Sequence, residues 1–241
     1  MKLRVTFTIP DGYLDYGFQM GVVSLIKEAL RRSDNTYFNK LYGKDNVTKP
    51  FCFATFFHEP TFKKDKIFLK QLSITVSSLD HEFLLHFHNG LIQIVEFQYK
   101  EVCWIKENVQ LLKEKNISSP SVIFKTLSPL LIEDKKGNPL SPEHTSYEEE
   151  LNYYADVLAQ EFHHRSLYRS IVVKNHNMKK TVIKSTNREW EKNKKGFLYF
   201  TAYRGLIELD GHPEDLKLMY RVGLGRRRTQ NFGLLDVYRQ T

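Results

Sequence analysis

A stretch near the end of the sequence combines the residue types that bind phosphate groups. Residues 222–233 read VGLGRRRTQNFG, so glycines flank three consecutive arginines. Glycine lets the backbone adopt positive φ and brings N–H groups close to a phosphate. The arginine guanidinium stays charged and suits a phosphate or a guanine edge. The stretch predicts an anion-binding loop, with a solvated basic turn as the alternative. The residues assigned to binding are Gly223, Gly225, Arg226, Arg227, Arg228, Gln230 and Asn231.

A second basic stretch covers residues 178–196, MKKTVIKSTNREWEKNKKG. It predicts a hairpin, and a solvated face is its simplest interpretation. In an RNA-binding protein, Lys184 and Arg188 of this hairpin would hold the phosphates of a stem, since proteins recognise RNA stems through shape and backbone.

The histidines and cysteines do not form a metal-binding pattern. His81, His86 and His88 lack zinc-finger partners and the i, i+4 spacing of a helical site. Cys52 and Cys103 stand in the apolar stretches FCF and VCW, which predicts two small buried hydrophobic residues. The sequence therefore predicts neither a metal nor another cofactor.

Composition narrows the class of protein. The 241 residues are enough for one large or two small domains, and a 41% hydrophobic content predicts a folded globular protein. A net charge of +8 favours a polyanionic partner. No apolar run approaches the ~20 residues that span a membrane, and MKLRVTFTIP resembles a strand more than a signal peptide. A cytoplasmic protein is expected.

Hydrophobic periodicity predicts the elements that position these residues. In the first half we expect strands over 2–9, 51–57 and 66–76, helices over 17–33 and 79–90, and further strand over 91–106. Residues 34–50 are polar and basic, which predicts a long connection, and Gly90 is expected to end the second helix. Residues 111–121 read as a linker.

The pattern then restarts. We expect strands over 121–126, 179–186, 196–208 and 232–238, and helices over 145–163 and 211–221. The order strand–helix–strand–strand–helix–strand occurs twice. An α+β fold of two tandem ferredoxin-like (RRM-like, βαββαβ) domains is therefore predicted, with domains at 1–114 and 115–241.

Three segments resemble the CRISPR repeat-processing endoribonucleases, within the superfamily of repeat-associated (RAMP) proteins. Gly-apolar-Gly, an arginine-rich run and x-Phe-Gly at the C-terminus are similar to that family's glycine-rich loop. FKTLSPLLI (124–132) and KPFCFATF (49–56) are similar to two of its strands. Asn231 replaces a family glycine, and asparagine is expected to keep the left-handed backbone.

The resemblance implies metal-independent cleavage of CRISPR repeat RNA (pre-crRNA). The ribose 2′-OH attacks the adjacent phosphorus and leaves a 2′,3′-cyclic phosphate and a 5′-OH. Such chemistry needs a base, an acid and a cation. The family usually has a histidine just after the first helix, but here its position is taken by Tyr42. The candidate catalytic residues are thus Tyr37, Tyr42, Lys44 and Lys49.

A tyrosine with a pKa of ~10 is a poor base unless lysines lower that pKa, whereas lysine can serve as acid and cation. Two main hypotheses follow: a slow, histidine-independent endoribonuclease, or a non-catalytic RNA-binding subunit that joins other subunits of a CRISPR effector complex. A protein-interaction module would leave the arginines unexplained. Both a monomer and a homodimer are compatible with the sequence, and a membrane partner is not expected.

Overall fold

The computed structural model describes residues 1–44, 47–63, 66–185 and 198–240. Contacts divide the chain into two compact units. The first comprises residues 1–49, 55–112 and 184–199, and the second comprises residues 50–54, 113–183 and 200–241. The domain boundary at 114/115 stays a prediction.

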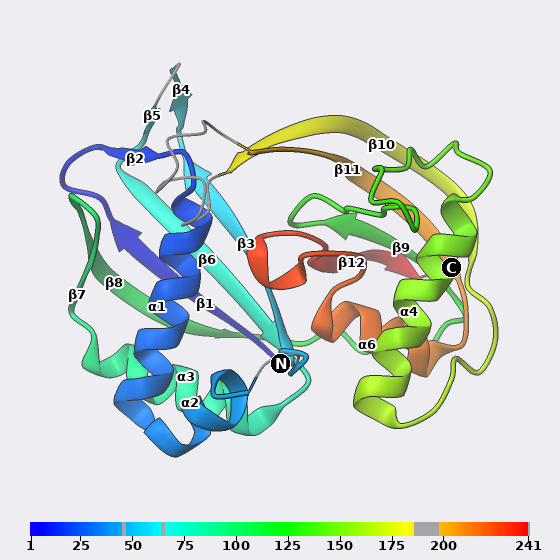
Figure 1. Cartoon of the computed structure of the whole chain (residues 1–241), viewed down its shortest axis with the longest axis horizontal. Coiled ribbons are helices and arrows are strands. Elements are labelled where there is room, and N and C mark those ends of the chain that lie inside the picture. Colours follow the sequence, from blue (N-terminus) through cyan, green and yellow to red (C-terminus); the bar gives the residue numbers. More distant parts are fainter. Residues whose placement is uncertain (45–46, 64–65, 186–197, 241) are drawn as a thin grey trace. The chain divides into compact units, whose positions relative to one another are not determined.

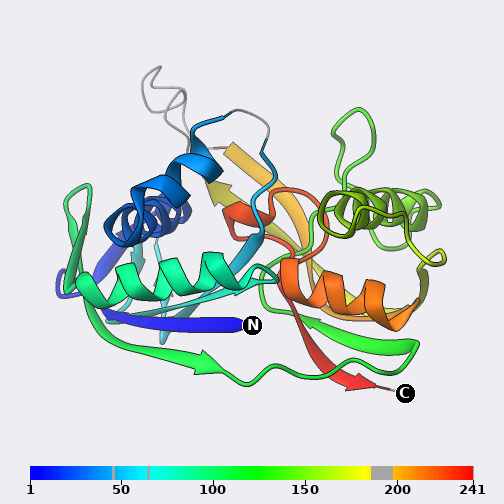
Figure 2. The same cartoon turned by 90° about the horizontal axis from the view of Figure 1, so that it is seen from below.

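The first unit is built on an antiparallel sheet that helices cover on one face. The apolar residues Leu3, Val5 and Phe7 alternate along the first strand and are buried, as expected for a strand with one face against a core. The strands in spatial order are β3 (Phe51–His58), β6 (Gln71–Ser78), β1 (Lys2–Thr8), β8 (Val102–Leu112) and β7 (Glu96–Tyr99). Figures 1 and 2 show α1 (Phe18–Ser33) and α3 (His81–Gln93) against the same face of this sheet.

Gly90 lies inside α3, so the expectation that it ends the helix is wrong. The helix continues to Gln93. A Cβ at residue 90 would lie 1.7 Å from the carbonyl oxygen of Ala29 on α1. The glycine therefore serves the close approach of two helices and does not cap one of them.

The connection expected over 34–50 contains a helix, α2 (Asn35–Tyr42). Asp34 caps it, because its carboxylate accepts a hydrogen bond from the backbone N–H of Tyr37 at 2.9 Å. Tyr37, Phe38 and Leu41 form its buried face, with the spacing of one helical side. The polar composition of the segment concealed this pattern.

The strand expected over 66–76 is also two strands. β5 (Lys66–Phe68) pairs with β2 (Tyr13–Asp15) and with β4 (Thr61–Phe62) in a small separate sheet. β6 begins only at Gln71. The chain changes direction between them, so that β5 lies in the small sheet and β6 in the main sheet.

The second unit repeats the first topology. Its strands in spatial order are β10 (Val172–Ser185), β11 (Leu198–Asp210), β9 (Ser121–Thr126) and β12 (Leu235–Gln240). Figures 1 and 2 show α4 (Tyr147–His163) and α6 (Pro213–Val222) side by side on one face of this sheet. The strands of the second unit have the chain order second–third–first–fourth across the sheet. The first unit has the same order when β8 is taken as its fourth strand, with β7 added at the edge beside β8. The predicted pair of ferredoxin-like βαββαβ folds is therefore confirmed.

Both cysteines are free thiols, but only Cys52 is buried. Cys103 is partly exposed, so the expectation of two buried cysteines is wrong for Cys103. In the described ranges, none of the helices is long and apolar enough to cross a membrane.

Candidate functional site

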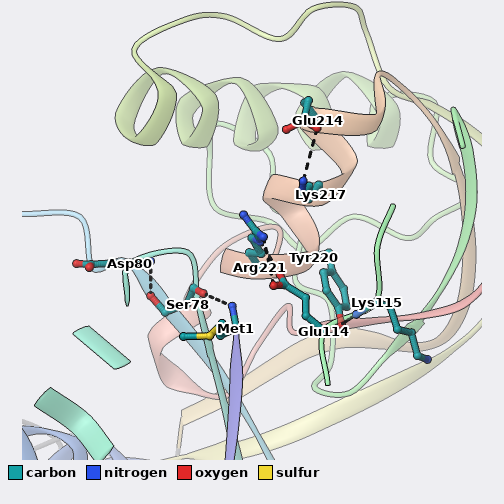
Figure 3. Close-up of polar contacts among 9 residues, drawn as sticks. All are labelled: Met1, Ser78, Asp80, Glu114, Lys115, Glu214, Lys217, Tyr220 and Arg221. Atoms are coloured by element: carbon teal, nitrogen blue, oxygen red, sulfur yellow. Dashed lines mark hydrogen bonds and ion pairs between the residues drawn. The ribbon is translucent and has the colours of Figure 1, made fainter. Parts of the chain in front are cut away.

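The glycine-rich loop begins where α6 ends, and polar contacts fix that end of the helix. Arg221 donates hydrogen bonds to both carboxylate oxygens of Glu114, the closer at 2.5 Å. The backbone N–H of Lys115 donates to the Tyr220 hydroxyl at 3.2 Å. Figure 3 shows both contacts, which join the last turn of α6 to the segment that precedes β9. The loop therefore starts from a fixed point.

The loop backbone is held by hydrogen bonds to its own unit. The N–H of Arg226 donates to the Leu131 carbonyl at 2.9 Å, and the N–H of Leu224 donates to the Gly233 carbonyl at 3.0 Å. Gly233 has a φ of 74°, and a Cβ there would lie 1.9 Å from the Leu224 oxygen. Several N–H groups that the sequence suggested for a phosphate are thus already occupied. The loop amides are therefore less suited to bind an anion than the sequence predicted.

The three arginines have different environments. Arg226 is exposed and donates to the carboxylate of Glu133 at 2.5 Å, and the Glu133 side chain is only 9% exposed. Arg227 stacks over the Phe200 ring at 4.4 Å. Arg228 points inward, since its Nη1 donates to the Val222 carbonyl at 2.6 Å. Burial lowers the pKa of the Arg227 and Arg228 guanidinium groups.

Gln230 and Asn231 support this arrangement. The Gln230 side-chain oxygen accepts a hydrogen bond from Nη1 of Arg227 at 3.1 Å. Asn231 is buried and has a φ of 70°, so the predicted left-handed backbone at this asparagine is confirmed. Its neighbour Phe232 packs into the core, and the Phe232 carbonyl accepts a hydrogen bond from the Cys52 thiol at 3.1 Å.

The basic hairpin is described only in part. Lys184 lies near the end of β10, and its Nζ lies 4.4 Å from the centroid of the Tyr16 ring. Arg188 lies outside the described residues, as do the other residues of 186–197.

In the first unit, two lysine side chains lie close to the ring of Tyr42. Lys27 of α1 places its Nζ 4.7 Å from the Tyr42 ring centroid, and Lys49 places its Nζ at 5.0 Å. The ring also stacks on Phe38 at 5.2 Å, and the Arg31 guanidinium covers Phe38 at 4.2 Å. We call Lys27, Arg31, Phe38, Tyr42 and Lys49 the cation–aromatic cluster. It concentrates positive charge at the junction of α1 and α2.

The tyrosine pKa values move away from what a general base needs. Burial raises the pKa of Tyr42. Burial and a hydrogen bond to Asp80 raise the pKa of Tyr37, whose hydroxyl donates to the Asp80 carboxylate at 2.8 Å. Both phenols therefore stay protonated at neutral pH. The lysines beside Tyr42 do not lower its pKa as a base would require.

The two candidate lysines after α2 differ in their surroundings. Lys49 donates a hydrogen bond to the Val47 carbonyl at 2.6 Å and belongs to the cation–aromatic cluster. Lys44 is exposed, two residues beyond the end of α2.

Three side chains near these residues were missed as site residues from the sequence. Lys27 and Arg31 lie four residues apart on α1. Their spacing places them on one face of the helix, and this was the only sequence signal for a site, because their residue types alone did not indicate one. His86 stacks on the Tyr37 ring at 4.8 Å, and its Nδ1 shares a hydrogen bond of 3.0 Å with the Ser33 hydroxyl. A histidine from α3 thus lies beside α2, where the sequence segment itself has none.

The comparisons with known proteins agree with the fold. A protein from Pyrococcus furiosus described as Cas6-related is 16% identical, with a TM-score of 0.82 over 100% of this chain and 99% of its own. A RAMP protein described as binding different RNA substrates is 18% identical, with a TM-score of 0.80 over 99% of this chain and 100% of its own.

A third structure, described as the CRISPR associated protein Cas6, is 18% identical, with a TM-score of 0.75 over 99% of both chains. No curated protein matches the sequence. The family model described as "CRISPR associated protein Cas6, C-terminal" matches residues 112–237. That range is more than half of the chain and contains the whole glycine-rich loop. The protein therefore belongs to the Cas6 family of CRISPR-associated proteins.

Proposed function

We propose that this protein binds CRISPR repeat RNA and cleaves it slowly, without a metal and without a catalytic histidine. The observation that carries the proposal is the family match over 112–237, which includes the glycine-rich loop. The likeness in fold to a RAMP protein described as binding different RNA substrates supports the RNA partner. The net charge of +8 fits a polyanion as well.

In this proposal the loop binds the RNA backbone through Arg226. Arg226 is the exposed guanidinium of the three, and its ion pair with Glu133 holds the planar fork in one orientation. A pre-oriented guanidinium loses less entropy when it binds a phosphate. Arg227 and Arg228 act mainly on the shape of the loop, because one packs on Phe200 and the other bonds Val222.

The cation–aromatic cluster supplies the chemistry. The RNA 2′-oxygen forms a bond to the adjacent phosphorus while the bond from phosphorus to the 5′-oxygen breaks. The ammonium of Lys49 gives a proton to the leaving 5′-oxygen, and the proton of the 2′-OH passes to solvent. Lys27 and Arg31 stabilise the charge on the phosphorane, with Lys44 as a further cation. Tyr42 is the platform that positions Lys27 and Lys49, and Tyr37 anchors α2 on Asp80.

A histidine-independent reaction gains its rate from alignment of the 2′-OH and from electrostatics, and the rate enhancement from these two effects is large in other reactions. Because no base is supplied, a low turnover is expected. His86 tests this point, since it lies beside Tyr37. Replacing it by glutamine, His86→Gln, should change single-turnover cleavage by less than about 3-fold, against about 10²-fold or more for a true general base.

The second candidate is a non-catalytic repeat-RNA-binding subunit. The raised pKa of Tyr37 and the engagement of its hydroxyl by Asp80 favour it, because they remove a group that could act in proton transfer. The fold and the loop would serve such a subunit equally well.

One experiment separates the two. Repeat RNA is incubated with the protein in EDTA, and the product ends are analysed. Cleaved RNA with a cyclic phosphate end, lost when the nucleotide at the cut carries a 2′-deoxy sugar, supports the enzyme. RNA that is bound but intact identifies the binding subunit. Cleavage that persists on the 2′-deoxy substrate would contradict the proposed mechanism.

A further inference from the structure

A cavity of about 900 Å³ lies in the first unit between α1 and the strand β7. From α1 it is lined by Met20, Val23, Ser24, Lys27 and Arg31, and from the other side by residues 96–100. Its size falls in the range of ligand sites in proteins. None of the residues that line the cavity belongs to the glycine-rich loop.

One wall of the cavity is fixed by a close contact between α1 and β7. Gly21 of α1 has no side chain, and a Cβ there would lie 2.7 Å from Cδ1 of Tyr99 and 3.0 Å from the Trp104 ring. Tyr99 therefore packs directly on the helix backbone. Tyr99 is only partly buried, and the Nζ of Lys100 lies 5.7 Å from the centroid of its ring. An aromatic ring beside a cation suits a nucleobase next to a phosphate.

The charges around the cavity favour an anion. Lys27, Arg31, Arg32 and Lys100 line it, against two acidic residues, Glu28 and Glu96. Glu28 is engaged by Arg32 at 2.9 Å. Apart from this pair, the charged residues that line the cavity are three cations, Lys27, Arg31 and Lys100, and one carboxylate, Glu96. Cations on the helix and beside the strand suit a ligand with charge repeated along its length.

The cavity shares two residues with the cation–aromatic cluster. Lys27 and Arg31 line the cavity and also lie over the rings of Tyr42 and Phe38. The helix from Met20 to Arg31 is about 16 Å long at ~1.5 Å per residue. At ~3.4 Å per nucleotide of a stacked strand, that length corresponds to about four or five nucleotides.

We propose that this cavity is a second RNA subsite, which holds the single-stranded RNA that flanks the cleaved phosphate. The inference rests on the proposed function, because the scissile phosphate is placed at the cluster. Lys100 and the α1 cations contact the RNA backbone, and Tyr99 contacts a base. Stacking of bases on aromatic rings beside a basic groove is how proteins hold single strands without reading their sequence.

The test uses two variants at residues that line the cavity but do not belong to the cluster. Ser24→Trp fills the cavity with a ring, and Lys100→Gln removes one charge while keeping the side-chain length. Lys70→Gln is the matched control, since Lys70 is an exposed lysine of the same unit that does not line the cavity. Fluorescence anisotropy measures the binding of three RNAs. They are the repeat RNA without an extension, the same RNA with five extra nucleotides on one side of the cut, and the same RNA with five extra nucleotides on the other side.

The wild-type protein should bind one of the extended RNAs more tightly than the unextended RNA. Ser24→Trp and Lys100→Gln should weaken the binding of that extended RNA by about 3–10-fold and leave the binding of the unextended RNA unchanged. Lys70→Gln should leave the binding of both RNAs unchanged. Equal affinity of the wild type for all RNAs overturns the inference, as does unchanged binding by both variants. In those cases the proposed function stands. It fails separately if the wild type does not bind the unextended repeat. Lys100→Gln keeps the test valid if Ser24→Trp misfolds.

Discussion

The glycine-rich loop and the cation–aromatic cluster are built in opposite ways. The loop is specified by its backbone: left-handed residues, and hydrogen bonds from Leu224 and Arg226 to carbonyls of its own unit. The cluster is specified by side chains: the Nζ atoms of Lys27 and Lys49 lie 4.7 and 5.0 Å from the centroid of the Tyr42 ring, and the pKa of Tyr42 is raised. A backbone-defined site is more sensitive to glycine changes than to side-chain changes. A side-chain-defined site shows the reverse, which the predictions below exploit.

The largest effect is expected from Gly233→Ala. The Cβ would lie 1.9 Å from the Leu224 oxygen, and the φ of 74° is strained for alanine. We expect a loss of about 3 kcal/mol or more in the free energy of unfolding. At about 2–4 °C per kcal/mol, Tm falls by about 6–12 °C, and RNA binding is lost with it.

Gly137→Ala is the matched control. Its φ is 84°, but nothing lies within 4 Å of the added Cβ. Only the backbone strain of about 1–2 kcal/mol applies. Equal losses for the two variants in a thermal unfolding assay would show that the loop is not closely packed at Gly233.

A smaller effect is expected for Arg228→Gln. The change removes a partly buried guanidinium that bonds the Val222 carbonyl, which costs about 2 kcal/mol, or about 4–8 °C in Tm.

The comparison is the double variant Arg226→Gln with Glu133→Gln, which removes an ion pair without leaving a buried carboxylate unpaired. It should change stability by less than about 1 kcal/mol. If the double variant proves the less stable of the two, the roles that we assign to these arginines are reversed.

The next effect in size is expected for Tyr37→Phe and concerns stability at alkaline pH. The pKa of Tyr37 is raised in the folded state, whereas in the unfolded chain it is ~10. Its contribution is therefore complete below pH ~10 and is lost as the pH rises further. The Tyr37→Phe variant should be less stable at pH 8 by about 1–2 kcal/mol and should lose less stability between pH 9 and 11 than the wild type. Tyr238→Phe, at an exposed tyrosine, should match the wild type throughout.

The smallest effect is expected for Tyr42→Phe. A phenol with a raised pKa is no base, so cleavage should change by less than about 3-fold. Tyr42→Ala removes the ring that positions Lys27 and Lys49 and should slow cleavage by about 10-fold or more, since two cation–π contacts are lost. If both variants lose a large and equal part of the cleavage rate in single-turnover assays, the Tyr42 hydroxyl takes part in the chemistry.

The sequence predicted the fold well because ferredoxin-like units follow from hydrophobic periodicity. It also predicted the left-handed Asn231, since few residues adopt that backbone. It did not predict α2, because the spacing of Tyr37, Phe38 and Leu41 was hidden by polar neighbours. The role of Gly90 depends on Ala29, which is remote in sequence.

Site residues were harder to predict than the fold. Arginine composition alone could not tell an exposed Arg226 from an inward Arg228, because only the folded loop decides which side each faces. Likewise Lys27, on α1, joins the cluster only through the packing of α1 against α2.

The central claim is that the loop binds RNA while the cluster cleaves it. The most direct test measures Kd and the single-turnover cleavage rate at saturating repeat RNA for two variants. The double variant Arg226→Gln with Glu133→Gln should raise Kd by about 10-fold and leave the saturated rate unchanged. Lys49→Gln should leave Kd within about 3-fold and lower the rate by about 10²-fold. A normal rate for Lys49→Gln, or a normal Kd for the double variant, would contradict the account.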